Sequence, residues 1–364
     1  MTPTSPRRFR DLFWGLLAVF VLAVLGLEGL SLLTGDRFWP VQVFGYVRDI
    51  ALMLALIPLP IALWRRRRHP VVLQLLVAVS LLWAPASAHV QPRIAPVGSV
   101  EVTVMTYNLG DGLATPVALM PLLEQSGADI IGLQEVSPDT AVAIETHLDS
   151  VYPYRVVRGL GIPGKALLSK YPIIEHHWLE INPDRPDLLA TVDINGTLTT
   201  VIVAHPPPPH LTTSGIVSRP GGDEQFNALV DVVARNDGPL LLLGDLNITH
   251  HHDFYDRLRS LGLVDVFAES GNGLGYTTPA RFPALDDVSE TLADAPMIPL
   301  LRIDYVWGTS HWYPLESWVA EDAGSDHLPV MARLALAETS ASVSVADDTF
   351  PVAVPLGVLV DVQD

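Results

Sequence analysis

Three long apolar stretches occupy the first ninety residues of the chain: Leu12–Thr34, Val41–Trp64 and Val71–Ala88. A helix needs roughly 20 apolar residues to cross a bilayer core, so the first two stretches are long enough and the third is borderline. Glu28, Arg48 and Asp49 interrupt the first two, and charges inside lipid are costly unless they face other helices or the interface. The pattern predicts a membrane region over residues 1–88 with two to three transmembrane helices.

Basic residues flank these stretches unevenly. Arg7, Arg8 and Arg10 precede the first one, and four arginines at 65–68 separate the second from the third. The positive-inside rule places both groups in the cytoplasm. Three crossings then give a multi-pass protein of the cell membrane, with a cytoplasmic N-terminus and an extracytoplasmic domain. Two alternatives stay open: a two-helix hairpin leaves the domain inside, and signal cleavage after Ala88, at Ala86-Ser87-Ala88, releases it.

The pattern changes after residues 89–99, which contain prolines and a glycine and are typical of a linker. Residues 100–338 hold short β-branched runs that alternate with helical spacing. Helices are predicted at Thr115–Ser126, where Gly127 ends the helix, and at Pro138–Leu148. Strands are predicted at 100–109, 129–136, 165–173, 188–205, 239–247, 302–308 and 326–336.

The segment 188–205 is predicted to be a hairpin, because Asn195-Gly196 lies between two alternating runs. Strands outnumber helices, which indicates an α/β fold with two packed sheets and helices outside them. Residues 339–364 form an acidic C-terminal tail, either disordered or one added strand, and we assign them no function.

Charge and cysteine content limit the possible functions. Residues 101–338 contain 12 Lys and Arg against 32 Asp and Glu, a net charge of about −20, and the chain has no cysteine. Thiolate metal sites and disulfides are therefore excluded. A general basic surface for nucleic acid is absent from the sequence, since Lys165 and Lys170 are the only lysines of this region. A local site can still bind an anion if a divalent cation neutralises it.

Polar residues stand where the predicted core strands end. Ends of core strands share one rim of a layered sandwich, so their side chains can converge in one cleft. The set combines carboxylates, amides and imidazoles, and its oxygens suit Mg²⁺. Its members are Asn108, Glu135, His205, Asp245, Asn247, Asp304, Asp326 and His327.

Seven blocks in order resemble the endonuclease/exonuclease/phosphatase superfamily, which has the DNase I-like fold. They are "TYNL", "IIGLQEV", "ALLSKYPI", "VIVAHPPPP", "LLLGDLN", "RIDYVW" and "GSDHLPV", and they extend over about Val102 to Leu336. The resemblance implies a four-layer sandwich, with two packed mixed β-sheets flanked by helices, preceded here by transmembrane helices. It also implies a metal-dependent hydrolase that uses Mg²⁺, with Mn²⁺ as an alternative.

The resemblance also implies roles for single residues. Asn108, Glu135 and Asp326 match the metal positions, with Glu135 as the principal ligand. Among the catalytic positions, Asp245 matches the residue that activates water, and Asn247 matches the amide that contacts the phosphate. His327 matches the histidine that hydrogen-bonds the phosphate, Asp304 matches the carboxylate that orients it, and His205 resembles the second histidine, with Asp187 as a candidate partner.

Several features lie outside the matched set. His250, His251 and His252 are expected in a loop and the first helical turn after the Asp245 strand; most simply they are polar residues at a helix start, and the alternative is that one touches substrate. Consecutive helical residues point about 100° apart, so all three cannot bind one metal from a helix. The proline-rich stretch 205–210 is either a rigid cleft wall or a surface turn. Arg219 is a candidate substrate ligand, and the acidic insertion 284–299 is a candidate cover for the cleft.

Three functional hypotheses follow. The leading one is a membrane-anchored, Mg²⁺-dependent phosphoesterase that hydrolyses a lipid head group or a small extracellular phosphodiester or phosphomonoester. The acidic surface and the tether favour such a substrate over duplex DNA. A surface or secreted nuclease acting on DNA or RNA is the second hypothesis, and steep salt dependence would favour it. A catalytically idle membrane binding module is the third, although it has no reason to keep every matched polar position.

Overall fold

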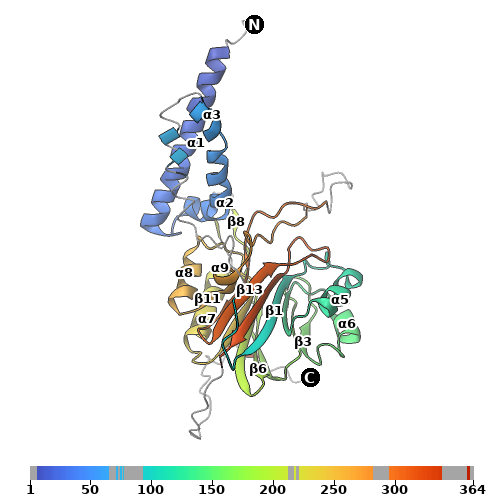
Figure 1. Cartoon of the computed structure of the whole chain (residues 1–364). Helices are drawn as coiled ribbons and strands as arrows, with labels where there is room; N and C mark the ends of the chain where they lie inside the picture. The colour runs from blue at the N-terminus through green and yellow to red at the C-terminus, as the bar shows by residue number, and fades with distance from the viewer. Residues whose placement is uncertain are drawn as a thin grey trace. The chain divides into compact units, whose positions relative to one another are not determined.

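The computed structural model describes residues 6–64, 71–72, 74–75, 77, 93–211, 217–218, 221–281, 295–337 and 359–360. The chain forms two compact units, shown in Figure 1. Unit 1 comprises residues 1–86 with the segments 210–218 and 249–255. Unit 2 comprises residues 87–209, 219–248 and 256–364.

Unit 1 is built on apolar helices. They are α1 (Pro6–Thr34), α2 (Trp39–Leu56) and α3 (Leu59–Trp64), and Val21 and Val24 of α1 pack with Phe44 and Leu52 of α2. Two segments, Asp11–Thr34 and Trp39–Trp64, are long and apolar enough to cross a membrane. Of the third apolar stretch only 71–72, 74–75 and 77 are described, and they are helical; Ala86-Ser87-Ala88 lies outside the described residues.

Unit 2 contains two mixed β-sheets. The six-stranded sheet has the order β13-β14-β1-β2-β4-β3, and the seven-stranded sheet has the order β11-β12-β10-β7-β6-β5-β15. The first sheet comprises β1 (Val100–Asn108), β2 (Ile130–Gln134), β3 (Tyr154–Arg158), β4 (Lys165–Ser169), β13 (Trp312–Val319) and β14 (Val330–Leu336). The second comprises β5 (Ile173–Leu179), β6 (Asp187–Ile194), β7 (Thr197–Ala204), β10 (Leu240–Asp245), β11 (Val264–Asp265), β12 (Asp304–Gly308) and β15 (Leu359–Val360). A separate pair, β8 (His210–Leu211) and β9 (Val217–Ser218), belongs to unit 1.

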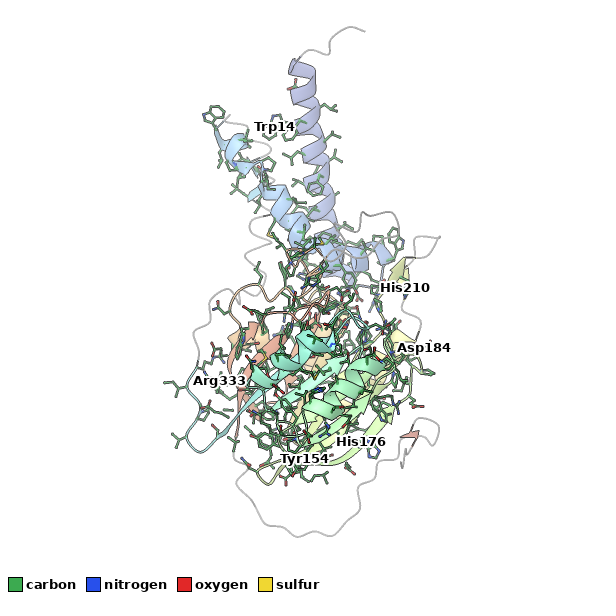
Figure 2. All side chains as sticks on the ribbon, turned by 90° about the vertical axis from the view of Figure 1, so that its right-hand side faces the viewer. Trp14, Tyr154, His176, Asp184, His210 and Arg333 are labelled. Carbon is green, nitrogen blue, oxygen red and sulfur yellow. The ribbon has the colours of Figure 1, made fainter. Side chains whose placement is uncertain are left out.

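The two sheets pack face to face through alternate residues of their strands. Val102 and Val104 of β1 join Val203 of β7 and Leu243 of β10 in one buried cluster. Successive strand residues point to opposite faces, so Met105 of the same strand packs on the other side. There it meets α5 (Pro116–Gln125) and α6 (Pro138–His147), which cover the first sheet, and Figure 2 shows side chains filling the layers.

Helices α7 (Gly222–Ala234), α8 (Asp253–Ser260) and α9 (Val266–Ser270) complete the described elements. Phe226, Leu229 and Val233 of α7 are buried, as expected for an amphipathic helix that covers a sheet. Two packed mixed sheets flanked by helices confirm the predicted α/β sandwich.

Local sequence rules predicted several boundaries correctly. The β6–β7 hairpin turns at Asn195 and Gly196, which both have positive φ (52° and 91°), as a type I′ turn requires. Helix α5 begins after Thr115 and ends at Gln125, two residues before Gly127, whose φ is 74°.

Other expectations were wrong. The run 165–173 is not one strand, because β4 ends at Ser169 and the chain passes to the other sheet at Ile173. Helix α8 begins at Asp253, so His250–His252 lie before it rather than in its first turn. Strands β3, β5 and β13 and helix α7 were not predicted, since their sequences lack clean alternation or contain internal polar residues.

The sheet topology brings strand ends together. Strand β1 runs parallel to β2, and β7 runs parallel to β10. Strand β12 runs antiparallel to β10, in a register that pairs Asp245 with Asp304. The carboxyl ends of β10 and β7 and the start of β12 therefore lie along one edge of the second sheet.

Candidate active site

Two of the predicted site residues adopt backbone conformations that side-chain-bearing residues rarely adopt. Glu135 follows β2 with φ 54°, and Asn247 follows β10 with φ 52°. Such conformations cost free energy and occur at sites where the surroundings hold them in place. The Asn247 backbone is held by its own N–H, which donates to Asp245 Oδ1 at 2.9 Å, and its side chain donates to the Pro206 carbonyl at 3.0 Å.

Asp304 and His327 form a buried pair beside Asp245. His327 Nδ1 lies 2.9 Å from Asp304 Oδ2, and Nε2 of the same ring lies 3.8 Å from Asp245 Oδ2. The Thr277 hydroxyl donates to the same oxygen, Asp304 Oδ2, at 2.5 Å and helps to fix the carboxylate. The Asp304 carboxylate therefore holds the imidazole with its Nε2 toward Asp245.

The two carboxylates change the protonation of this histidine. Burial by itself lowers the pKa of His327, but Asp304 and then Asp245 outweigh it and raise that pKa to about 10. Burial, reinforced by Asp304, raises the pKa of Asp245 to about 7. At neutral pH His327 is therefore a cation, and Asp245 is poised to accept or release a proton.

Asn108 links the two sheets at this edge. Its side-chain amide donates to Asp245 Oδ2 at 3.0 Å, and its Oδ1 accepts from the Gly110 backbone at 3.0 Å. Ser325 donates to the Asn108 carbonyl at 2.7 Å and thereby ties the loop that carries Asp326 and His327 to the end of β1.

Glu135 faces His205 and an arginine that the sequence interpretation did not select. His205 Nε2 lies 3.5 Å from Glu135 Oε1 and 3.5 Å from Asp245 Oδ2. Arg185 Nη1 lies 3.9 Å from Glu135 Oε1, and 3.0 Å and 2.5 Å from the two ring nitrogens of His205. Burial raises the pKa of Glu135, while the Arg185 charge opposes that shift.

His205 is held in the neutral form. Burial, and then the charge of Arg185, lowers the pKa of His205 well below its usual value. Asp187 does not pair with the ring, contrary to the candidate pairing. It accepts a 3.0 Å hydrogen bond from the His205 backbone N–H and a 2.8 Å bond from the Gln225 side chain. Asp187 thus fixes the chain at the end of β7 rather than the charge of the imidazole.

The donor set fits a hard divalent cation. Glu135 and Asp326 offer carboxylates that are not fully buried, and Asn108 lies beside Glu135, within hydrogen-bonding range of it. Oxygen donors of this kind suit Mg²⁺ or Mn²⁺. Asp245, Asp304 and His327 also cluster within 4.8 Å, but a protonated imidazole bound to Asp304 has no lone pair for a metal. The cation is therefore expected at Glu135.

Two basic residues were missed by sequence reasoning. Arg185 precedes β6, and Lys165, noted only for the scarcity of lysine, lies fully buried on β4. The Lys165 ammonium donates to the Pro186 carbonyl at 2.5 Å and lies 3.9 Å from Asp187, and burial lowers its pKa to about 8. A charged residue at the first position of an apolar strand was the available signal for Lys165, whereas Arg185 lies two residues before β6 and the strand pattern does not mark it. Arg219 lies outside the described residues, as do residues 284–294 of the acidic insertion.

A carboxylate that can act as a base, an oriented imidazolium, a fixed arginine and oxygen ligands are the groups that a metal-dependent hydrolase of phosphoric esters uses. The endonuclease/exonuclease/phosphatase family model matches residues 105–327, and the chain belongs to that family. No curated protein shows significant similarity to the chain.

Several solved structures are similar to the chain at low sequence identity. A family protein from Bacteroides thetaiotaomicron is 19% identical with a TM-score of 0.47, over 66% of this chain and 99% of that one. A 3′ phosphatase from Neisseria, bound to a product DNA hairpin, is 22% identical with a TM-score of 0.48, over 64% and 98%. Sphingomyelinase C from Streptomyces griseocarneus is 20% identical with a TM-score of 0.45, over 64% and 99%.

Proposed function

We propose that the chain is a membrane-anchored, Mg²⁺-dependent phosphoesterase that hydrolyses a lipid head group or a small extracytoplasmic phosphoester. The phosphodiester or phosphomonoester bond is cleaved by attack of water. The observation that carries the proposal is the joint position of Asp245 and the His327–Asp304 pair beside Glu135.

The side chains divide the work of hydrolysis. Asp245, with a pKa of about 7, accepts the proton of the attacking water. Asn247 holds a phosphoryl oxygen through its amide, and the His327 imidazolium donates a hydrogen bond to the oxygen on which charge develops. When bound at Glu135, Asn108 and Asp326, Mg²⁺ or Mn²⁺ supplies Lewis-acid polarisation of the phosphoryl group.

The leaving oxygen needs a further positive group, because His205 is neutral in this structure. Arg185 supplies that charge from its position against His205 and Glu135. An arginine cannot release a proton at physiological pH, so it stabilises the leaving oxygen as a fixed cation.

The charge of the domain favours a small or lipid substrate. Residues 101–338 carry about −20, and a duplex is normally gripped by many Lys and Arg that release counterions. Besides the His327 imidazolium, the cations described at the site are local ones, such as Arg185 and the buried Lys165. A nuclease that acts on DNA or RNA with the same residues is the second candidate, and a catalytically idle binding module is the third.

Anchoring rests on the two candidate spans, Asp11–Thr34 and Trp39–Trp64. We place the N-terminus in the cytoplasm because of Arg7, Arg8 and Arg10, and the hydrolase domain outside because a third crossing after the arginines at 65–68 completes an odd number. Labelling of an added C-terminal tag in intact cells tests this orientation. Protection of the tag until the membrane is opened would contradict it.

The function is tested with the full chain in detergent micelles and a substrate panel. The panel holds bis-p-nitrophenyl phosphate, p-nitrophenyl phosphate, phospholipid vesicles, single- and double-stranded DNA, and RNA, each with Mg²⁺ and with EDTA. We expect Mg²⁺-dependent cleavage of a small or lipid ester that is absent from Glu135→Ala. Preferred cleavage of DNA or RNA would favour the nuclease, and no cleavage by a folded, Mg²⁺-binding chain would favour the idle module.

A further inference from the structure

The histidine run 250–252 lies in a loop of unit 1 that is not helical. The loop follows Thr249 and ends where α8 begins at Asp253, and residues 249–255 group with α1 and α2. Without helical geometry, consecutive side chains are not forced about 100° apart. The rings of His250 and His251 lie side by side, with centroids 3.8 Å apart.

Contacts within unit 1 hold this loop against α2. The Thr249 hydroxyl donates to the Gly45 carbonyl at 2.8 Å, and the His252 ring packs on Tyr46 with centroids 4.4 Å apart. A Cβ on Gly45 would lie 3.1 Å from Cε1 of His252, so glycine permits this close approach. His252 therefore packs against the helix.

His250 and His251 meet a carboxylate from α2. His251 Nε2 lies 3.1 Å from Asp49 Oδ1, and one ligand atom from each of Asp49, His250 and His251 lies within 4.8 Å of the others. All three side chains are partly buried. We infer that Asp49, His250 and His251 form a second metal site, which binds a divalent transition-metal ion such as Zn²⁺.

The ligand chemistry distinguishes this site from the one at Glu135. Two imidazoles with one carboxylate suit Zn²⁺ and its neighbours, whereas Mg²⁺ prefers oxygen ligands alone. Zinc bonds to His and Asp are about 2.0–2.2 Å long, so small rotations of the three side chains bring their ligand atoms to one ion. Three protein ligands leave the fourth tetrahedral position to water.

The neighbouring charges allow a cation here. Arg48 Nη1 lies 3.4 Å from both Asp49 Oδ1 and His251 Nε2, which by itself would oppose a metal ion. The same guanidinium is paired with Glu28, however, through Nε at 2.7 Å from Oε2 and through a second contact from Nη2 to Oε1. Glu28, Arg48 and Asp49 together carry one negative charge, which a divalent ion bound between neutral imidazoles would compensate.

Such an ion would join α2 to the loop that starts two residues after Asn247. A metal that cross-links two distant parts of a chain stabilises the folded state by its binding free energy. The second site would therefore fix the segment that follows the strand carrying Asp245, without providing a ligand for the hydrolytic reaction.

Metal binding by the full chain in detergent micelles tests the inference. The chain is stripped of metal and carries Glu135→Gln to remove the principal ligand of the other site. We expect one equivalent of Zn²⁺ per chain, retained in excess Mg²⁺, and a visible Co²⁺ spectrum with nitrogen ligands. Asp49→Asn, His250→Asn and His251→Asn should each weaken Zn²⁺ binding by at least about 10- to 100-fold, because the loss of a direct ligand costs no less than the loss of a residue that only orients one.

The chain offers a matched control. His176 and His177 are also consecutive and lie near Glu175, but they are on β5, where successive side chains point to opposite faces. Figure 2 shows His176 on the surface of unit 2. The double variant His176→Asn, His177→Asn should therefore still bind one equivalent of Zn²⁺. Circular dichroism in metal-free buffer verifies that each variant is folded. Absence of the Zn²⁺ equivalent, its retention in Asp49→Asn and His251→Asn, or its loss in the control pair would overturn the inference.

Discussion

Nη1 of Arg185 lies 3.0 Å from Nδ1 and 2.5 Å from Nε2 of His205, so a fixed cation stands against an imidazole that is itself neutral. One protonated histidine would supply both the positive charge and the buried ring, whereas here Arg185 supplies the charge and His205 supplies the ring. The guanidinium carries the charge, and Nε2 of the buried ring lies 3.5 Å from both Glu135 and Asp245.

Arg185→Gln should lower kcat/KM by about 100-fold, because removing one preorganised charge-stabilising group from an active site typically costs a factor of this size. Steady-state kinetics on bis-p-nitrophenyl phosphate measures the loss. Arg155→Gln is the control, since Arg155 pairs with Glu145 on the surface at 2.6 Å. Equal rates in the two variants would show that Arg185 has no part in the reaction.

Asp304→Asn should lower kcat by about 100-fold or more, because the amide no longer favours the imidazolium at His327. Thr277→Val keeps the carboxylate but removes its 2.5 Å hydrogen bond, and should cost less. Single-turnover rates compare the two variants, with thermal unfolding as a test of the fold. A Thr277→Val rate below that of Asp304→Asn would contradict this order.

The activity should have a bell-shaped pH dependence. Asp245 acts as a base only when ionised, so kcat rises as pH passes its pKa of about 7. His327 acts only when protonated, so kcat falls as pH passes its pKa of about 10. Rates measured between pH 5 and pH 11 at saturating Mg²⁺ check both limbs of the profile. The two apparent pKa values belong to the interacting pair of groups and not to either group alone. The alkaline limb should be absent from the residual activity of His327→Gln.

The same histidine makes stability depend on pH. Its pKa is raised above the ordinary value, so its contribution is fully present below about pH 6.5 and is lost as pH rises toward 10. The Tm of the wild-type chain should therefore fall across this window by more than the Tm of His327→Gln. If Tm falls with pH equally in the two proteins, His327 is not charged in the folded state.

Glu135→Gln should weaken Mg²⁺ binding at the hydrolytic site by about 10- to 100-fold, since an amide replaces the principal carboxylate ligand. Isothermal titration of the metal-stripped chain with Mg²⁺ measures the change, and Glu145→Gln on the surface of α6 serves as the control. Unchanged Mg²⁺ affinity in Glu135→Gln would remove Glu135 from the metal site.

Gly244→Ala should destabilise the second sheet by about 3 kcal/mol, a cost typical of overpacking. A Cβ at this position of β10 would lie 2.0 Å from the Ala204 carbonyl oxygen of β7, and backbone cannot move aside as a flexible side chain does. Gly238→Ala is the matched control, because a Cβ there meets no atom within 4 Å. Chemical denaturation of both variants measures the difference in their free energies of unfolding. Equal values would be inconsistent with the close approach of β10 to β7 at Gly244.

The sequence predicted those parts of the fold that depend on local rules. Alternation predicted β1 and β7, a continuous apolar run predicted β10, and the Asn195-Gly196 turn predicted the β6–β7 hairpin. Polar residues at the ends of apolar strands predicted Glu135, Asp245 and His327 as candidate site residues, because burying a polar side chain is costly unless it is paired or serves a function. Strand β3 and helix α7 escaped prediction, since their stability comes from packing on sheets whose order the sequence does not state.

The sequence alone determined the family resemblance, the acidic surface and the inventory of site residues, because each depends on residue types and their order. The tertiary structure alone decided which side chains meet. Arg185 reaches His205 only because β6 and β7 are adjacent, and Asp187 binds a backbone N–H rather than the ring. His251 meets Asp49 across 202 residues of chain, a contact that no local pattern encodes because it arises from the packing of distant segments.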